Sequence, residues 1–279
     1  MRLVWQLLAV AAIAAAGSQA VAAVQDNDLL TLVLGLLTAV LSVAVYRWVV
    51  RRTEHRPVTE AARDGAVPGI VRGTLLGAAL FGAVIGNIAF LGDYHVDGLG
   101  SLPGATGLVG FMAAAAATEE LLFRGVLFRI IEERTGTWIA LVLTGTLFGL
   151  SHLLNKDATL WGAIAIAIEA GGMLTAGYVA TRSLWLPIGL HFGWNFAESG
   201  IFSTEVSGNG STHGLLDSSM SGAKLITGGS FGPEGSLYSV LFGLLTTIAF
   251  MWLARRRGTV LPRRSRRTAE TPAVATLPR

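Results

Sequence analysis

The sequence predicts an all-α protein, a polytopic transmembrane helix bundle of about eight helices with a central polar cavity. Two observations carry this prediction. Hydrophobic residues make up 52% of the 279 residues and charged residues only 14%, a balance typical of membrane proteins. Several ionisable residues nevertheless lie inside apolar stretches, where they are expected to face an interior cavity. The chain has no cysteine, which excludes disulfides, thiol nucleophiles and thiolate metal ligands.

A helix needs roughly 20 apolar residues to cross a bilayer, and eight stretches are about this long. They cover residues 3–23, 29–50, 69–91, 105–129, 138–154, 158–180, 184–202 and 237–254. The first stretch, within residues 1–23, also resembles a secretory signal peptide, because small residues follow its apolar run. We favour an uncleaved helix, since only Arg2 is positive and the apolar run is long. The third stretch contains glycine pairs four residues apart, at 73 and 77 and at 82 and 86, which favour close helix packing.

Lysine and arginine predict the orientation. With the amino terminus in the cytoplasm, only Lys156 and Lys224 of the 21 lysines and arginines fall on the outer side. We therefore expect a multi-pass protein of a prokaryotic plasma membrane, with its C-terminal tail in the cytoplasm. The arginine clusters at 47–72 and after 255 could contact nucleic acid or anionic lipid. Because juxtamembrane arginines are expected in this class, we predict the lipid bilayer as a partner and no nucleic acid.

The predicted organisation has five regions. Residues 1–104 form the N-terminal transmembrane helices, and residues 105–202 form the core that carries the chemistry. Residues 203–236, rich in Gly and Ser, form an outer loop that could cover a cavity. Residues 237–254 form the last helix. Residues 255–279 form a basic, disordered cytoplasmic tail, because they contain prolines and lack apolar periodicity.

The fourth stretch contains two adjacent glutamates, in the segment A-A-A-A-A-T-E-E-L-L-F-R at 113–124. Glu120 and Arg124 are four residues apart, the spacing of an ion pair on one helix face. Glu119 is rotated by about 100° from Glu120 and lies on the face of Phe123. Outside the ion pair, a carboxylate in this position is a suitable general base.

Two later stretches carry histidines that could meet Glu119. His152 ends the segment F-G-L-S-H at 148–152, and His191 begins the segment H-F-G-W-N at 191–195, with Asn195 one turn later on the same face. We expect these side chains to converge inside the membrane, in a site reached from the cytoplasm. Two histidines and a glutamate could equally form a three-ligand zinc site with an open water position.

Together these segments resemble the three motifs EExxxR, FxxxH and HxxxN of the CPBP family. That family comprises the type II CAAX prenyl endopeptidases and their bacterial relatives, the Abi proteins. The resemblance covers roughly residues 105–200 and implies an intramembrane endopeptidase whose helices enclose a conical cavity. It implies that Glu119 and His152 activate water, and that His191 and Asn195 stabilise the oxyanion. Glu120 with Arg124 would hold the fourth helix.

The family has been described both as metalloproteases and as metal-free glutamate proteases. A divalent metal such as zinc, if used, would be held by Glu119, His152 and His191. The HExxH motif is absent, and we favour metal-free water activation. The predicted substrate is a membrane-associated protein or peptide, cleaved in CAAX-type processing or as a bacteriocin or regulator.

The sequence is compatible with two other functions, and it contains two further carboxylates whose roles need to be considered. The chain could be a non-catalytic membrane immunity or scaffold protein on the same fold. It could also be a proton-coupled transporter that uses Glu119 and Glu169 as relay groups. We expect Glu169 to be structural. Glu198 shares a helix face with His191 and Asn195, so it is either structural or orients one of them.

Overall fold

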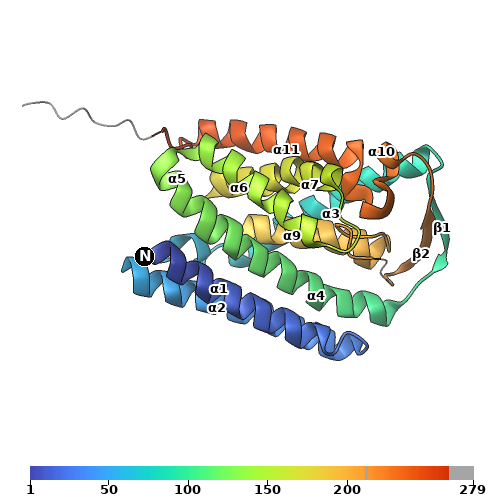
Figure 1. Cartoon of the computed structure of the whole chain (residues 1–279), viewed down its shortest axis with the longest axis horizontal. Coiled ribbons are helices and arrows are strands. Elements are labelled where there is room, and N and C mark those ends of the chain that lie inside the picture. The colour runs from blue at the N-terminus through green and yellow to red at the C-terminus, as the bar shows by residue number, and fades with distance from the viewer. Residues whose placement is uncertain (211–212, 264–279) are drawn as a thin grey trace, which may run out of the picture.

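The computed structural model describes residues 1–210 and 213–263 and confirms an all-α polytopic bundle (Figure 1). Within these ranges, seven helical segments are long and apolar enough to cross a membrane. They are Arg2–Ala22, Asp28–Glu54, Ala66–Phe90, Leu102–Thr135, Thr137–Leu154, Leu160–Thr181 and Leu237–Arg256. The remaining predicted stretch, 184–202, is also helical, as α9 (Trp185–Phe196) followed by a π-helical turn (Ala197–Ile201), but it is shorter than the others.

The α-helices follow the predicted stretches closely. They are α1 (Arg2–Ala22), α2 (Asp28–Glu54), α3 (Ala66–Phe90), α4 (Leu102–Glu120), α5 (Arg129–Thr135), α6 (Thr137–Ser151), α7 (Leu160–Ile166), α8 (Met173–Thr181), α9, α10 (Lys224–Thr227) and α11 (Leu237–Arg256). Four of them begin with a side-chain cap, in which Asn27, Ser101, Thr159 or Ser236 accepts a bond from a backbone N–H of the first turn. The alternative that residues 1–23 are a signal peptide stays a prediction.

Three π-helical turns interrupt the core of the bundle. They are Leu121–Phe128 between α4 and α5, Ala167–Gly172 between α7 and α8, and Ala197–Ile201 after α9. A π turn contains one residue more than an α turn and is frequent at functional sites. All three adjoin or contain the carboxylates and the asparagine that the sequence singled out. The sequence analysis did not predict them, because apolar periodicity over so few residues does not distinguish the two helix types.

The helices α3 and α9 pack with their backbones in contact. A Cβ atom added at Gly77 would lie 2.2 Å from the Leu190 carbonyl oxygen, and one added at Gly193 would lie 2.1 Å from the Thr74 carbonyl oxygen. The first glycine pair of the third stretch therefore serves helix packing, as predicted. The second pair does not, because an added Cβ at either Gly82 or Gly86 has no neighbour within 4 Å.

This contrast predicts opposite effects of two glycine-to-alanine substitutions in α3. Gly77→Ala should lower the free energy of unfolding by about 1–3 kcal/mol, because the added methyl group overlaps the α9 backbone. Gly86→Ala should be neutral or stabilising by up to about 1 kcal/mol, because alanine is the better helix former and space is free. Thermal unfolding of the purified variants measures both. Equal destabilisation would contradict the close α3–α9 contact.

Ion pairs and hydrogen bonds link the helices at the end of the bundle that carries the amino terminus and α5. Arg129 donates to Glu54 at 2.7 and 2.8 Å and to Gln6 at 2.9 Å, which links the long fourth helix to α1 and α2. Glu60, in the loop after α2, pairs with Arg56 at 2.7 Å. Burial favours a higher pKa for Glu60, but Arg56, a backbone N–H and the Tyr46 hydroxyl together hold this pKa below its usual range. The loop is therefore anchored by an ionised carboxylate.

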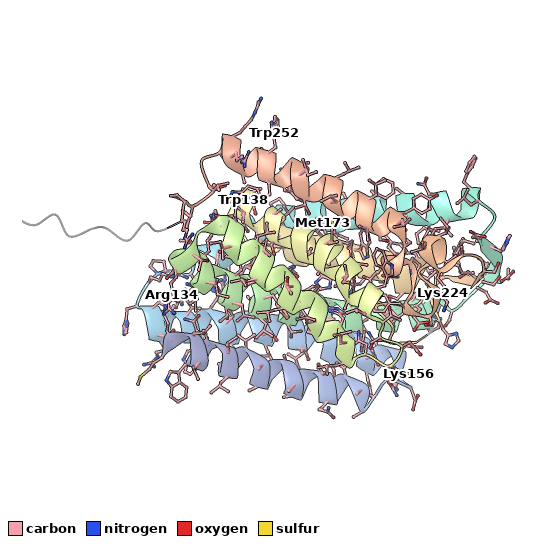
Figure 2. All side chains as sticks on the ribbon, turned by 45° about the horizontal axis from the view of Figure 1, so that its top comes forward. Arg134, Trp138, Lys156, Met173, Lys224 and Trp252 are labelled. Carbon is pink, nitrogen blue, oxygen red and sulfur yellow. The ribbon has the colours of Figure 1, made fainter. Side chains whose placement is uncertain are left out.

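The opposite end of the bundle carries a structure that the sequence analysis did not predict. Strand β1 (Tyr94–Leu99) pairs antiparallel with β2 (Leu216–Met220), so the α3–α4 connection holds the segment predicted as the outer loop. Lys156 and Lys224 lie at this end and Arg134 lies at the other (Figure 2). In that segment, short helical turns at Gly229–Phe231 and Pro233–Gly235 lead into α11.

The prediction of a disordered tail from residue 255 is wrong for its first part. Helix α11 continues to Arg256, and the chain then folds back along the start of α6. The Leu261 N–H donates to the Thr137 hydroxyl at 2.8 Å, and the Thr137 N–H donates to the Leu261 carbonyl at 3.0 Å. The short apolar run before Pro262 supplies this attachment. Residues 264–279 of the predicted tail lie outside the described residues.

Candidate active site

Glu120 and Arg124 form the predicted ion pair in the interior of the bundle. The Arg124 Nη1 atom lies 2.6 Å from Glu120 Oε1, and both side chains are buried. Arg124 also donates to the Ala170 carbonyl at 2.9 Å and to the Thr175 hydroxyl at 3.2 Å, and its guanidinium lies 4.6 Å from the centre of the Phe148 ring. A buried arginine with this many partners fixes the fourth helix against α6, α8 and the second π turn.

Glu120 has a second partner that sequence spacing did not predict. Its Oε1 atom lies 3.0 Å from His191 Nδ1, on a helix 71 residues further along the chain. Because an ionised carboxylate only accepts hydrogen bonds, Nδ1 of His191 carries a proton here. Glu120 therefore orients the His191 ring, in addition to pairing with Arg124.

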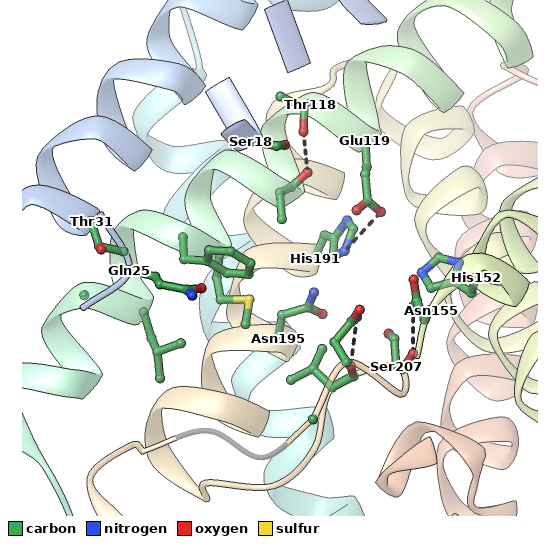
Figure 3. Close-up of a pocket in the computed structure, with 18 of the residues that line it drawn as sticks. Ser18, Gln25, Thr31, Thr118, Glu119, His152, Asn155, His191, Asn195 and Ser207 are labelled. Atoms are coloured by element: carbon green, nitrogen blue, oxygen red, sulfur yellow. Dashed lines mark hydrogen bonds and ion pairs between the residues drawn. The ribbon is translucent and has the colours of Figure 1, made fainter. Parts of the chain in front are cut away.

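Glu119 faces a different environment from its neighbour. Its side chain is 36% exposed, whereas that of Glu120 is fully buried, so the two glutamates differ as the sequence predicted. The Oε2 atom of Glu119 lies 4.0 Å from Nε2 of His191 (Figure 3). The Glu119 carboxylate lines the open cavity and is accessible to water.

His152 directly follows the last residue of α6 and begins a short 3₁₀ turn, His152–Leu154. Its Nδ1 atom lies 2.8 Å from the Phe148 carbonyl oxygen. A carbonyl can only accept, so Nδ1 bears a proton, and Nε2 is the ring nitrogen that this bond leaves free. Phe148 also packs against His152 at 4.8 Å and against His191 at 6.1 Å between ring centres. It thus holds both histidines.

One cavity of about 840 Å³ brings the predicted residues together. Its wall includes Glu119, His152, His191 and Asn195 (Figure 3). Asn195 is almost fully buried, one helical turn after His191. Glu120 and Arg124 do not line this cavity; their buried ion pair contacts the wall residue His191. The predicted central polar cavity is therefore present.

The cavity opens at the end of the bundle opposite the arginine clusters. Its wall reaches Gln25, Asp26 and Asp28 of the α1–α2 turn, and it includes Val206 and Asn209 of the segment after α9. With the predicted orientation this is the outer end, so the structure does not support the expected access from the cytoplasm. The orientation itself stays a prediction, so the side from which the site is reached does too.

The segment after α9 supplies wall residues that sequence reasoning missed. Asn155 donates to the Ser207 carbonyl at 2.7 Å, and the Ser207 hydroxyl donates to Glu234. These bonds fix the segment against the end of α6 and against the turn before α11. Its Gly- and Ser-rich composition was a signal for a cavity-covering loop, but no motif identified Asn155, Ser207 or Glu234.

Glu169 and Glu198 do not contact His191 or Asn195 by any hydrogen bond within the described residues. Both are fully buried and lie in π turns. Glu169 lines a second, very small cavity of about 10 Å³, together with Glu234 and both histidines. That volume is on the order of one water molecule. The prediction that Glu169 is structural stays untested, as do the two alternatives for Glu198, a structural role or the orientation of a neighbour.

The predicted metal ligands do not form a metal site in this structure. Among the described residues, no group of three or more His, Asp or Glu side chains is arranged to hold a metal ion. The Oε2 atom of Glu119 and the Nε2 atom of His191 lie 4.0 Å apart. The Nδ1 atom of His191 contacts Glu120, and His152 lines the same cavity as Glu119 and His191. No step of the chemistry is therefore assigned to a metal.

Residues 101–197 match the family described as type II CAAX prenyl endopeptidase Rce1-like. The matched segment begins at the cap of α4 and ends two residues after Asn195, so it contains every residue of the three motifs. Comparison with curated proteins and with solved structures gave no match. The match covers 97 of the 279 residues, and over this segment the chain is similar to that family. The seven helical segments that are long and apolar enough to cross a membrane fit a multi-pass membrane protein.

Proposed function

We propose that this chain, a CPBP-family intramembrane protease by its residues 101–197, hydrolyses peptide bonds of membrane-associated proteins or peptides with Glu119 as general base. One observation carries the proposal. Glu119, His152, His191 and Asn195 line a single cavity inside the helix bundle, and a buried ion pair fixes the helix that carries Glu119. This set contains a base and hydrogen-bond donors, the two requirements of amide hydrolysis.

In the proposed reaction, the Glu119 carboxylate takes a proton from a water molecule, and the resulting hydroxide attacks the scissile carbonyl carbon. His152 assists at the water through the lone pair on Nε2, which its bond to the Phe148 carbonyl leaves free. The carbonyl oxygen becomes an oxyanion as the tetrahedral intermediate forms. The proton on Glu119 then passes to the leaving amine as the C–N bond breaks.

His191 and Asn195 stabilise the oxyanion in this scheme. In its doubly protonated form, His191 donates from Nδ1 to Glu120 at 3.0 Å and from Nε2 into the cavity. The Asn195 amide supplies a second donor. A well-placed donor of this kind contributes about 3–4 kcal/mol to transition-state stabilisation.

The substrate class follows from the position and lining of the cavity. The wall combines the polar residues above with apolar residues of α4, including Leu108, Phe111 and Met112. A peptide segment that enters from the membrane surface and presents apolar side chains fits such a wall. We propose no specific prenyl group or cleavage sequence.

Comparison of membrane proteomes tests the function. Cells that make the wild-type chain should contain a cleaved membrane-associated product, and cells that make Glu119→Gln should accumulate its uncleaved precursor. Asp217→Asn, an exposed carboxylate on β2, is the control and should behave as wild type. Identical proteomes for wild type and Glu119→Gln would reject the protease and favour an immunity or scaffold protein.

A further inference from the structure

A second large cavity lies on the flank of the bundle, away from the candidate active site. It is a groove of about 1010 Å³ between α2 and α3, and its floor is formed by α4 and α9. The groove arises because α2 packs on α1 and α4, whereas α3 packs on α9. Apolar side chains line most of it, among them Val40, Val43, Val109 and Phe192. Its volume is that of a site for a sizeable small molecule.

Four arginines line one end of this groove: Arg47, Arg51, Arg52 and Arg63. Within the described residues, none of the four forms an ion pair. The nearby carboxylates Glu54 and Glu60 are engaged by other arginines, and Arg47 donates only to the Ala61 carbonyl. The groove therefore ends in a cluster of positive charge without an anionic partner in the structure.

The face of α2 in the groove changes from apolar to cationic along its length. Val40, Val43, Ala44, Arg47 and Arg51 recur at three- and four-residue intervals, so they form one stripe. Trp48 and Trp185 line the groove near the arginines. Tryptophans are enriched where a membrane meets water, so the arginines lie at the level of the lipid headgroups and the apolar part lies at the level of the acyl chains.

We propose that this groove is a binding site for an anionic phospholipid of the surrounding bilayer, with the acyl chains in the apolar part and the phosphate on the arginines. Arginine binds phosphate through paired N–H donors, and basic pockets between transmembrane helices bind acidic headgroups. The site is independent of the proposed peptidase function. It shares α4 and α9 with the candidate active site, since Ala117 and Phe192 face the groove while Glu119 and His191 face the cavity.

Native mass spectrometry of the delipidated full chain tests this site, with phosphatidylglycerol and phosphatidylcholine of identical acyl chains as probes. Wild type should bind one phosphatidylglycerol at least about ten-fold more tightly than phosphatidylcholine, since the arginines attract the net negative headgroup of the first lipid only. The triple variant Arg51→Gln, Arg52→Gln and Arg63→Gln should lose this preference. Equal binding of the two lipids by wild type would overturn the proposal.

Two further variants separate the groove from general charge attraction. The triple variant Arg255→Gln, Arg256→Gln and Arg257→Gln removes the same charge from the same end of the bundle, outside the groove, and should keep the preference. Ala44→Trp, at an exposed position in the groove, should displace the lipid while all arginines remain. A loss of preference in the control, or unchanged binding by Ala44→Trp, would overturn the site.

The alternative occupant of the arginine cluster is free inorganic phosphate, without a lipid attached. Inorganic phosphate at millimolar concentration should not displace the phospholipid, because the acyl chains contribute to its affinity. Complete displacement would show a simple anion site and overturn the proposal. If the arginine triple variant does not fold, the single variant Arg52→Gln should still reduce the preference measurably, because Arg52 is exposed and forms no ion pair in the described part of the chain.

Discussion

Replacement of Glu119 by glutamine is expected to lower kcat/KM for peptide hydrolysis by about 10²–10⁴-fold, the contribution of a positioned general base. The amide is nearly isosteric with the carboxylate but cannot take the proton from water. Because the Glu119 side chain is 36% exposed and forms no close ion pair, the fold should be unaffected. The measurement is cleavage of an identified substrate by purified protein in detergent or nanodiscs, with the unfolding temperature recorded in parallel.

The matched control for this substitution is Asp26→Asn. Asp26 is an exposed carboxylate that lines the same cavity near its mouth. Its removal changes the charge of the cavity by the same amount but leaves the proposed base in place. Comparable loss of activity in both variants would mean that cavity charge, and not a base at Glu119, supports hydrolysis.

Replacement of Arg124 by methionine is expected to lower the free energy of unfolding by about 3–5 kcal/mol, because it leaves Glu120 as a buried charge without its cation. Activity should be lost as well, since Glu120 also orients His191. Arg124→Lys should restore only part of the stability. A single ammonium group cannot bond Glu120, the Ala170 carbonyl and the Thr175 hydroxyl in the planar arrangement of the guanidinium.

Thermal unfolding of the purified variants measures this effect, and Arg134→Met is the control. Arg134 lies on the same long helical segment but is exposed at its end. The double variant Glu120→Gln with Arg124→Met should be more stable than Arg124→Met alone, because no unpaired charge remains. If Arg124→Met is as stable as Arg134→Met, the buried ion pair does not hold the fourth helix.

The sequence predicted the helices of the bundle and the Glu120–Arg124 ion pair, because both depend on residue spacing within one helix. Span length follows from bilayer thickness, so the ends of seven predicted stretches agreed with those of the membrane-spanning segments to within six residues. The Glu120–Arg124 pair followed from its four-residue spacing on one helix. The separate surroundings of Glu119 and Glu120 followed from the rotation per residue. Each of these depends on one helix only.

The features that escaped prediction depend on contacts between distant segments. The bond between Glu120 and His191 joins residues 71 positions apart, and the β1–β2 pairing joins two loops that look irregular in the sequence. The side on which the cavity opens depends on how α1, α2 and the segment after α9 are arranged around it. The sequence pattern contains no measure of these contacts, because it records polarity along the chain and not the packing between helices.

The π turn at Leu121–Phe128 constrains the number of residues in the fourth helical segment, in addition to their types. The extra residue rotates everything that follows by about 100° relative to an uninterrupted α-helix. Arg124 then reaches Ala170 and Thr175, and Glu132 further along reaches Arg182. A one-residue deletion between Glu120 and Arg129 would relax the turn to α geometry and turn these groups away from their partners. Insertions and deletions in this segment are thus far less tolerable than apolar substitutions.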